Sequence, residues 1–196
     1  MNPYILHQLN RSAEVIQALL ADTALADEVH RVSEICVAAL RDGRKVLFAG
    51  NGGSAADSQH LAGELVSRFA YDRPGLAAFA LTTDTSVLTA IGNDYGYEHL
   101  FARQIQAVGQ RGDVFIAFST SGRSKNILAA LREARARGIY TVGFTGQEGD
   151  AMGQDCDSLI KVPARETPKI QEGHITLGHI LCGLIEAAYF PRAEAP

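Results

Sequence analysis

Two side chains that could move a proton or bind a metal ion stand four positions apart, at His60 and Glu64. They belong to the segment FAGNGGSAADSQHLAGELVSRF, residues 48–69, in which a glycine-rich turn follows an apolar run. On a helix, residues i and i+4 share one face, one turn apart. An imidazole and a carboxylate in this arrangement suit metal binding or proton transfer. The simpler alternative is an ion pair on the protein surface.

A second segment with chemical potential is STSGRSKN, residues 119–126, which follows the apolar run DVFIAF. Hydroxyl side chains and the amides of a helix start, aimed at one point, would hold an anion with the help of the helix dipole. The lysine motif of triphosphate-binding loops is absent, so the segment favours a phosphomonoester. The alternative is that Ser124 only caps the helix. The hydroxyl residues are Ser119, Thr120, Ser121 and Ser124.

The turn GNGGSA, residues 50–55, formally matches the glycine fingerprint of dinucleotide-binding proteins. That fingerprint also expects an acidic residue at the end of the second strand, about 20 residues further on. Here that region is the loop RFAYDRPG, and Asp84 comes too late in the chain. The sequence therefore argues against a nicotinamide or flavin site, and a plain tight turn stays open as an alternative.

The segment TPKIQEGHITLGHILCGLIE, residues 167–186, places further candidate ligands on one long helix. Of its two histidines, His174 and His179, one is expected to be an ordinary core residue. Gln171 and His179 are eight positions apart, which separates their Cα atoms by roughly 12 Å on a straight helix. A metal ion bound by both would need long side-chain reach or a ligand from a second subunit.

The elements that must position these residues follow from hydrophobic periodicity. Residues 4–42 predict two helices, with a break near Asp22–Thr23 and an end at Gly43. Short apolar runs then predict strands buried on both faces, as in a parallel sheet: KVLFAG, LAAFAL, DVFIAFS, TVGFT and SLIKVP. Helices are expected at 54–69, 85–92, 98–108, 124–137, near Ala151 and at 168–190.

This alternation predicts a doubly wound α/β fold, with a parallel sheet of about five strands flanked by helices and an N-terminal helical arm. The length of 196 residues suggests one domain. Ligands of such sheets bind at the carboxyl ends of the strands. The loops expected to form the site are therefore 50–54, 82–86, 119–124 and 145–149.

The bulk composition excludes several classes of protein. A net charge of −4 without blocks of like charge gives no electrostatic case for nucleic acid or an acidic membrane surface. No segment is long and apolar enough to predict a membrane span, and the N-terminus is too polar for a secretory signal. The three cysteines, Cys36, Cys156 and Cys182, form no close pair, which favours a cytoplasmic protein without disulfides.

Three segments together resemble a known family: GNGGSAADSQHLAGEL, LTTDTSVLTAIGNDYGYEHLFARQIQAVGQRGDVFIAFSTSGRSKNILAAL and TPKIQEGHITLGHILCGLIE. The chain is similar to the sugar isomerase (SIS) domain family and, within it, to the phosphoheptose isomerases. The resemblance covers nearly the whole chain. It implies a single SIS domain over residues 1–196, in which the arm of residues 1–43 packs in the oligomer.

The resemblance implies a cytoplasmic homotetramer with its sites between subunits. It implies conversion of sedoheptulose 7-phosphate to D-glycero-D-manno-heptose 7-phosphate, on the way to the heptose of lipopolysaccharide. Glu64 and His179 would be the acid and base, and Gln171 would contact the substrate. One zinc per site would be held by His60, Glu64, Gln171 and His179. The sugar would meet Asn51, Gly52, Gly53, Ser54 and Asp94, and the phosphate Ser119, Thr120, Ser121 and Ser124.

The implied chemistry suits these residue types. Moving a carbonyl between C2 and C1 requires a base near both carbons and stabilisation of the enediolate oxygens. Two alternatives of another class stay open: a non-catalytic SIS protein that binds the replication initiator, and a regulator that senses a phosphosugar. The resemblance implies that the non-catalytic relative lacks the acid at the position of Glu64 and the imidazole at the position of His179.

Overall fold

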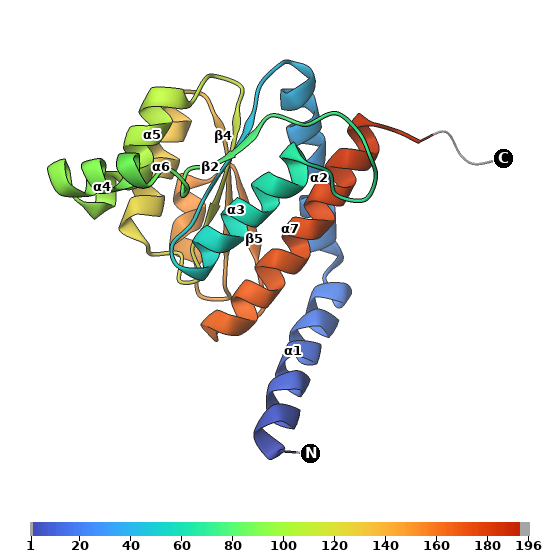
Figure 1. Cartoon of the computed structure of the whole chain (residues 1–196). Helices are drawn as coiled ribbons and strands as arrows, with labels where there is room; N and C mark the ends of the chain where they lie inside the picture. The colour runs from blue at the N-terminus through green and yellow to red at the C-terminus, as the bar shows by residue number, and fades with distance from the viewer. Residues whose placement is uncertain (1, 193–196) are drawn as a thin grey trace.

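The protein is built around a five-stranded parallel sheet, seen edge-on in the centre of Figure 1. The computed structural model describes residues 2–192. The strands lie in the order β2-β1-β3-β4-β5, so β2 is added on one side of β1 and the later strands are added on the other side. This is the doubly wound α/β fold predicted from the sequence. The strands are β1 (Val46–Ala49), β2 (Ala78–Ala80), β3 (Val114–Phe118), β4 (Tyr140–Thr145) and β5 (Ser158–Lys161).

Helices cover both faces of this sheet, as Figure 1 shows. The helices are α1 (Pro3–Ala21), α2 (Thr23–Arg41), α3 (Gly53–Val66), α4 (Thr85–Asp94), α5 (Leu100–Val108), α6 (Lys125–Ala136) and α7 (Thr167–Tyr189), with short 3-10 turns η1 (Tyr97–His99) and η2 (Asp150–Asp155). Strand β1 contacts helices on both faces, because Phe48 packs with the core beneath α2, α3 and α7, whereas Leu47 packs with the core beneath α5 and α6.

The edge strand β2 differs from its prediction. The run LAAFAL was expected to be buried on both faces, but Phe79 is 56% exposed. The reason is position, since β2 pairs only with β1 at the end of the sheet order. The three central strands are buried almost throughout, as their apolar runs predicted.

The predicted break between the first two helices is confirmed at Asp22. Its backbone N–H donates to Leu19 O at the end of α1, and its carboxylate accepts from Leu25 N at the start of α2. Helix α1 then extends away from the body of the molecule (Figure 1). Only Val15 of α1 is buried, although the helix carries many apolar side chains.

Helices α3 and α7 lie side by side and run in the same direction. Residues early in α3 face residues early in α7, and late residues face late ones. A Cβ on Gly178 would come within 2.6 Å of Leu61, and one on Gly183 within 3.1 Å of Phe69. These two glycines therefore let the helices approach closely. Helix α3 carries His60 and Glu64, and α7 carries Gln171 and His179, so this contact positions the candidate site.

Candidate active site

The structure brings together His60, Glu64 and His179, which were predicted as site residues. The Nε2 atoms of His60 and His179 are 2.8 Å apart, and His60 Nε2 is 3.1 Å from Glu64 Oε1. Ligand atoms of all three residues lie within 4.8 Å of one another. The site therefore places a carboxylate and two imidazoles around one point, although 119 positions separate the histidines. We call these three residues the triad.

The triad faces solvent while the other side of α3 holds the helix on the core. The side chain of His60 is 50% exposed and that of Glu64 is 23% exposed, whereas Leu61 and Leu65 are buried. Phe69 lies beyond the end of α3, and its ring packs 5.8 Å from the ring of His179.

Gln171, the fourth predicted ligand, lies away from the triad within one chain. Its side-chain amide packs against Gly53, where a Cβ would come within 2.6 Å of Nε2. Gly53 begins α3, seven positions before His60, which corresponds to about 10 Å along a helix. The separation between Gln171 and His179 that the sequence indicated is thus maintained in the fold.

The glycine turn between β1 and α3 presents the residues expected to meet a sugar. Gly52 has φ +59°, a conformation that other residues rarely adopt, and no atom lies near the position of a Cβ there. Asn51 exchanges two hydrogen bonds with Asn126, at 2.8 and 2.9 Å, and accepts one from Tyr97 Oη at 2.9 Å. Ser54 is buried beneath the turn.

Asn126 and Tyr97 were not singled out in the sequence. They line a pocket of about 550 Å³ together with the start of the glycine turn, the segment after α4 and the start of α6. A single tyrosine and a single asparagine, far apart in the chain, form no motif, so only the fold reveals that they meet Asn51. Asp94 ends α4, exposed, with its carboxylate accepting from Asn93. The pocket is lined by Asn51, Tyr95, Gly96, Tyr97, Glu98, Ser124, Lys125 and Asn126.

The hydroxyl-rich loop between β3 and α6 is the segment predicted to hold an anion. Ser124 occupies the N-cap position of α6, but its side chain makes no capping hydrogen bond. Its Oγ lies 2.9 Å from Ser119 Oγ instead. Capping therefore does not account for Ser124. Gly122, at φ +65°, packs so closely on Gly149 that a Cβ would lie 2.6 Å from its Cα. Thr120 is half-buried and Ser121 exposed.

Three comparisons with known proteins bear on this geometry. The SIS domain family matches residues 9–146. A phosphoheptose isomerase of Burkholderia pseudomallei is 61% identical over 189 residues, covering 96% of each chain. One from Aneurinibacillus thermoaerophilus is 56% identical, covering 97% of this chain and 96% of the other.

The chain belongs to the phosphoheptose isomerase family of SIS-domain proteins.

It is accordingly an isomerase. A solved phosphoheptose isomerase structure from Neisseria gonorrhoeae aligns with a TM-score of 0.87 at 39% identity, covering 94% of this chain and 97% of that one. In the part of the chain that the structure describes, no helix has the length and apolar character of a membrane span.

Asp57 is a residue near the triad that the sequence reading missed. It lies on α3 one turn before His60, and its Oδ2 is buried without a hydrogen-bond partner. Burial raises the pKa of its carboxyl, while the nearby His60 and His179 act to lower it. The sequence signal for Asp57 was its position three residues before His60, since residues i and i+3 share a helix face.

One of the two histidines of the last helix was expected in the core, and the structure shows that it is His174. It is fully buried against Phe118 and Phe144, with Nε2 3.1 Å from Thr145 O. Burial lowers its pKa to about 4, because the charged imidazolium would lose its hydration. His174 is therefore neutral at physiological pH and is separate from the triad.

This burial predicts how stability depends on pH. The unfolded chain protonates His174 near pH 6.5 and the folded chain only near 4. Stability should therefore fall as pH drops from 6.5 towards 4, by about 3 kcal/mol from this group. In His174→Gln, denaturant unfolding at several pH values should show a flatter slope across this window. An unchanged slope would show that His174 does not carry this dependence.

Proposed function

We propose that the protein is an aldose–ketose isomerase that converts sedoheptulose 7-phosphate to D-glycero-D-manno-heptose 7-phosphate. The observation that carries the proposal is the triad, because a carboxylate and imidazoles meet at one point in a member of this family. The names of the curated relatives support a phosphorylated heptose as substrate. The product would enter the synthesis of lipopolysaccharide heptose.

In the proposed mechanism Glu64 acts as the base. Its carboxylate takes a proton from C1 of the ketose and returns it to C2, so that one group near both carbons serves both steps. His179 donates a proton to the C2 carbonyl oxygen as the enediol forms, and it then accepts the proton of the C1 hydroxyl as the C1 carbonyl forms. This stabilises the enediolate between the two steps. The 23% exposure of Glu64 leaves its carboxylate accessible to a sugar.

The rest of the substrate is held away from the reacting carbons. The phosphate would bind the hydroxyls of the β3–α6 loop at the N-terminus of α6, whose dipole favours negative charge. This contact fixes the position of the sugar and so lowers the entropy lost in reaching the transition state. Ser119, Thr120, Ser121 and Ser124 would bind the phosphate. Asn51, Gly52, Gly53, Ser54, Asp94 and Gln171 would contact the sugar.

The triad also fits a metal ion. Two imidazole nitrogens and a carboxylate oxygen form a ligand set that zinc takes in catalytic sites, with positions left for other ligands. We propose one zinc per site, held by His60, Glu64 and His179, with Gln171 as a further ligand. When bound, zinc would supply a Lewis acid that polarises the substrate oxygens. Since Gln171 lies two turns from the triad in one chain, a neighbouring subunit is its expected source.

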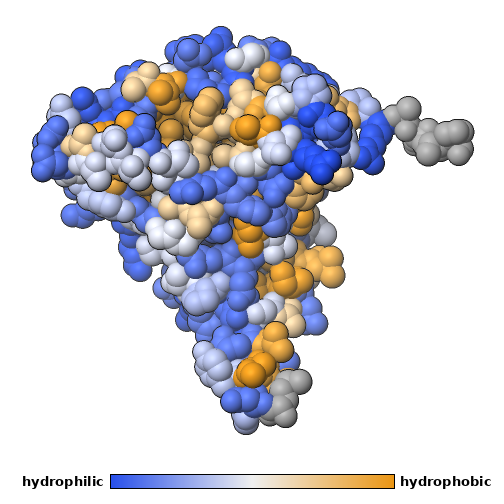
Figure 2. Space-filling view, in the orientation of Figure 1, coloured by the Kyte–Doolittle hydropathy of each residue, from blue (hydrophilic) through white to orange (hydrophobic). Residues whose placement is uncertain are grey.

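We propose that the chain forms a homotetramer with sites between subunits, in which the arm of residues 1–43 packs against other copies. Helix α1 exposes Ile5, Leu9, Ile16 and Leu20 at 43% or more. Figure 2 shows apolar residues gathered along this arm. An apolar groove of about 290 Å³ continues from α1 onto Ile180 of α7, the helix that carries His179. Burial of such a surface favours association.

Charge on this surface should break the assembly. In Leu9→Glu/Ile16→Glu, each charge would have to be buried without a partner, so sedimentation should show monomers or dimers. Gln17→Glu adds charge on the same helix at an exposed polar position and should leave the mass unchanged. A tetramer that persists in the double variant would remove α1 from the proposed interface.

The function is tested by incubating the purified protein with sedoheptulose 7-phosphate. We expect the aldose product to form, and unphosphorylated sedoheptulose to react far more slowly. The alternatives, a non-catalytic protein bound to the replication initiator and a phosphosugar-sensing regulator, are not favoured, because Glu64 and His179 are both present and in contact range of His60. Binding of the phosphosugar without turnover would support them. Cytoplasmic location stays a prediction.

A further inference from the structure

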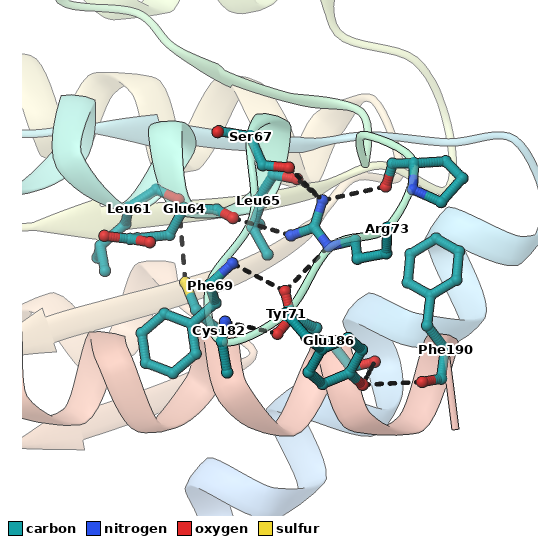
Figure 3. A network of polar contacts seen from close by, with 12 residues as sticks. Leu61, Glu64, Leu65, Ser67, Phe69, Tyr71, Arg73, Cys182, Glu186 and Phe190 are labelled. Atoms are coloured by element: carbon teal, nitrogen blue, oxygen red, sulfur yellow. Dashed lines mark hydrogen bonds and ion pairs between the residues drawn. The ribbon is translucent and has the colours of Figure 1, made fainter. Parts of the chain in front are cut away.

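A buried ion pair joins the loop after α3 to helix α7. Arg73 Nε lies 3.0 Å from Glu186 Oε2, and the two side chains are 2% and 1% exposed. Figure 3 shows both side chains between the end of α3 and α7, surrounded by backbone groups of the loop. We call Arg73 and Glu186 the clasp. Buried charges are costly unless they are paired and hydrogen-bonded, so these contacts need to be complete.

Glu186 is fully used as an acceptor. Its Oε2 accepts from Phe69 N at 2.8 Å and its Oε1 from Ala70 N at 2.7 Å, in addition to the bond from Arg73. Burial disfavours the charged carboxylate, but the two amides and the guanidinium outweigh it and hold its pKa below the usual range. Tyr71 Oη adds bonds to the carbonyls of Glu186 and Phe190. The loop is therefore fixed to α7.

Arg73 is directed at the end of α3. Its guanidinium donates to Glu64 O at 2.8 Å and to Leu65 O at 2.6 Å, and more weakly to Ser67 O at 3.2 Å. The last four carbonyls of a helix lack partners within the helix, and α3 ends at Val66. Arg73 satisfies two of them. The backbone that it caps includes Glu64 itself, whose side chain belongs to the triad.

We propose that the clasp is a positioning device that sets the placement of Glu64 relative to His179. It connects the turn of α3 that bears Glu64 to a point on α7 seven residues after His179, about two turns away. The clasp thus holds the two helices together beside the last turns of α3, where His60 and Glu64 of the triad lie. Its effect on turnover rests on the proposed function, whereas its effect on metal binding does not rest on the identity of the substrate.

The distances in the triad show why such positioning matters. His60 lies 2.8 Å from His179 across the two helices. A slide of α3 along α7 would change this distance directly, while leaving the phosphate loop between β3 and α6 in place. Misplacement of a reacting group by 1 Å can cost roughly 10²-fold in rate. A loss of the clasp should therefore lower kcat more than it raises KM.

The test uses Arg73→Lys and Glu186→Gln in the full-length protein. Lysine keeps the charge but cannot reproduce the planar fork of donors, and glutamine keeps the shape but not the charge. We expect kcat to fall at least ~10-fold with KM changed less than ~2-fold, and Co²⁺ to bind more weakly in a spectroscopic titration. Ile105→Ala is the control, because this fully buried residue of α5 lies beneath the opposite face of the sheet.

If the clasp only stabilised the fold, its variants would resemble Ile105→Ala in both kcat and Co²⁺ affinity. If kcat and Co²⁺ affinity, measured well below each melting temperature, equal those of Ile105→Ala, the proposal is overturned. If Arg73→Lys does not fold, Glu186→Gln decides the matter. If the wild-type protein binds Co²⁺ without isomerising the substrate, the proposed function fails. The clasp is then judged on metal affinity alone, where unchanged binding in both variants overturns it.

Discussion

Glu64→Gln should lower kcat by ~10²–10⁴-fold, the usual contribution of a general base, while the protein still binds phosphosugar. Glutamine has nearly the volume of glutamate and retains an oxygen near His60, but it cannot accept the proton from C1. The proposed phosphate contacts lie on the β3–α6 loop, which this substitution does not change. Turnover is measured with sedoheptulose 7-phosphate, and binding by calorimetry.

The chain contains a matched control for this variant. His30 and Glu34 also stand four apart on a helix, with Nε2 and Oε1 3.8 Å apart, but both are exposed on α2. Glu34→Gln should therefore leave kcat unchanged. Undiminished turnover in Glu64→Gln would remove Glu64 from the mechanism, and an equal loss in both variants would point to a general effect of charge.

Removal of the metal should abolish activity, which is the second large effect expected. We expect close to one zinc per chain to co-purify, and a chelator to lower kcat until zinc is restored. The reason is that zinc held by the triad would stabilise charge on the substrate oxygens in the proposed mechanism. The measurement is elemental analysis of active enzyme. Less than roughly one-tenth of an equivalent in fully active protein would contradict the zinc proposal.

A histidine variant distinguishes the site from adventitious metal. His60→Ala removes the imidazole that faces both other members of the triad, and should lower both the bound zinc and kcat. His30→Ala removes a surface imidazole of the matched pair and should change neither. Full zinc content in active His60→Ala would show that the metal binds elsewhere.

The order of the elements was readable from the sequence because its signals are local. Apolar runs of strand length and the polar break at Asp22 depend on neighbouring residues only, and the structure confirms both. The pairing of His60 with Glu64 was readable for the same reason, because helical spacing fixes it. Phe79 was misjudged because exposure of an edge strand depends on the order of strands in the sheet.

Contacts across the fold could not be read in the same way. His179 joins His60 only because α7 packs parallel to α3 through Gly178, which is a property of tertiary packing. The meeting of Asn126 with Asn51 across 75 positions has the same origin. Arg73 and Glu186 were missed because their sequence gives no sign that either is buried. The resemblance to a family pointed to His179 and Gln171, which spacing alone left open.

The most direct test of the account is to follow the reaction in D₂O by NMR with wild-type protein and Glu64→Gln. Proton transfer through Glu64 predicts that wild-type protein places deuterium at C2 of the aldose and at C1 of the recovered ketose. Glu64→Gln should do so at least ~10²-fold more slowly. Deuterium incorporation by Glu64→Gln at the wild-type rate would contradict the proposal that this carboxylate moves the proton.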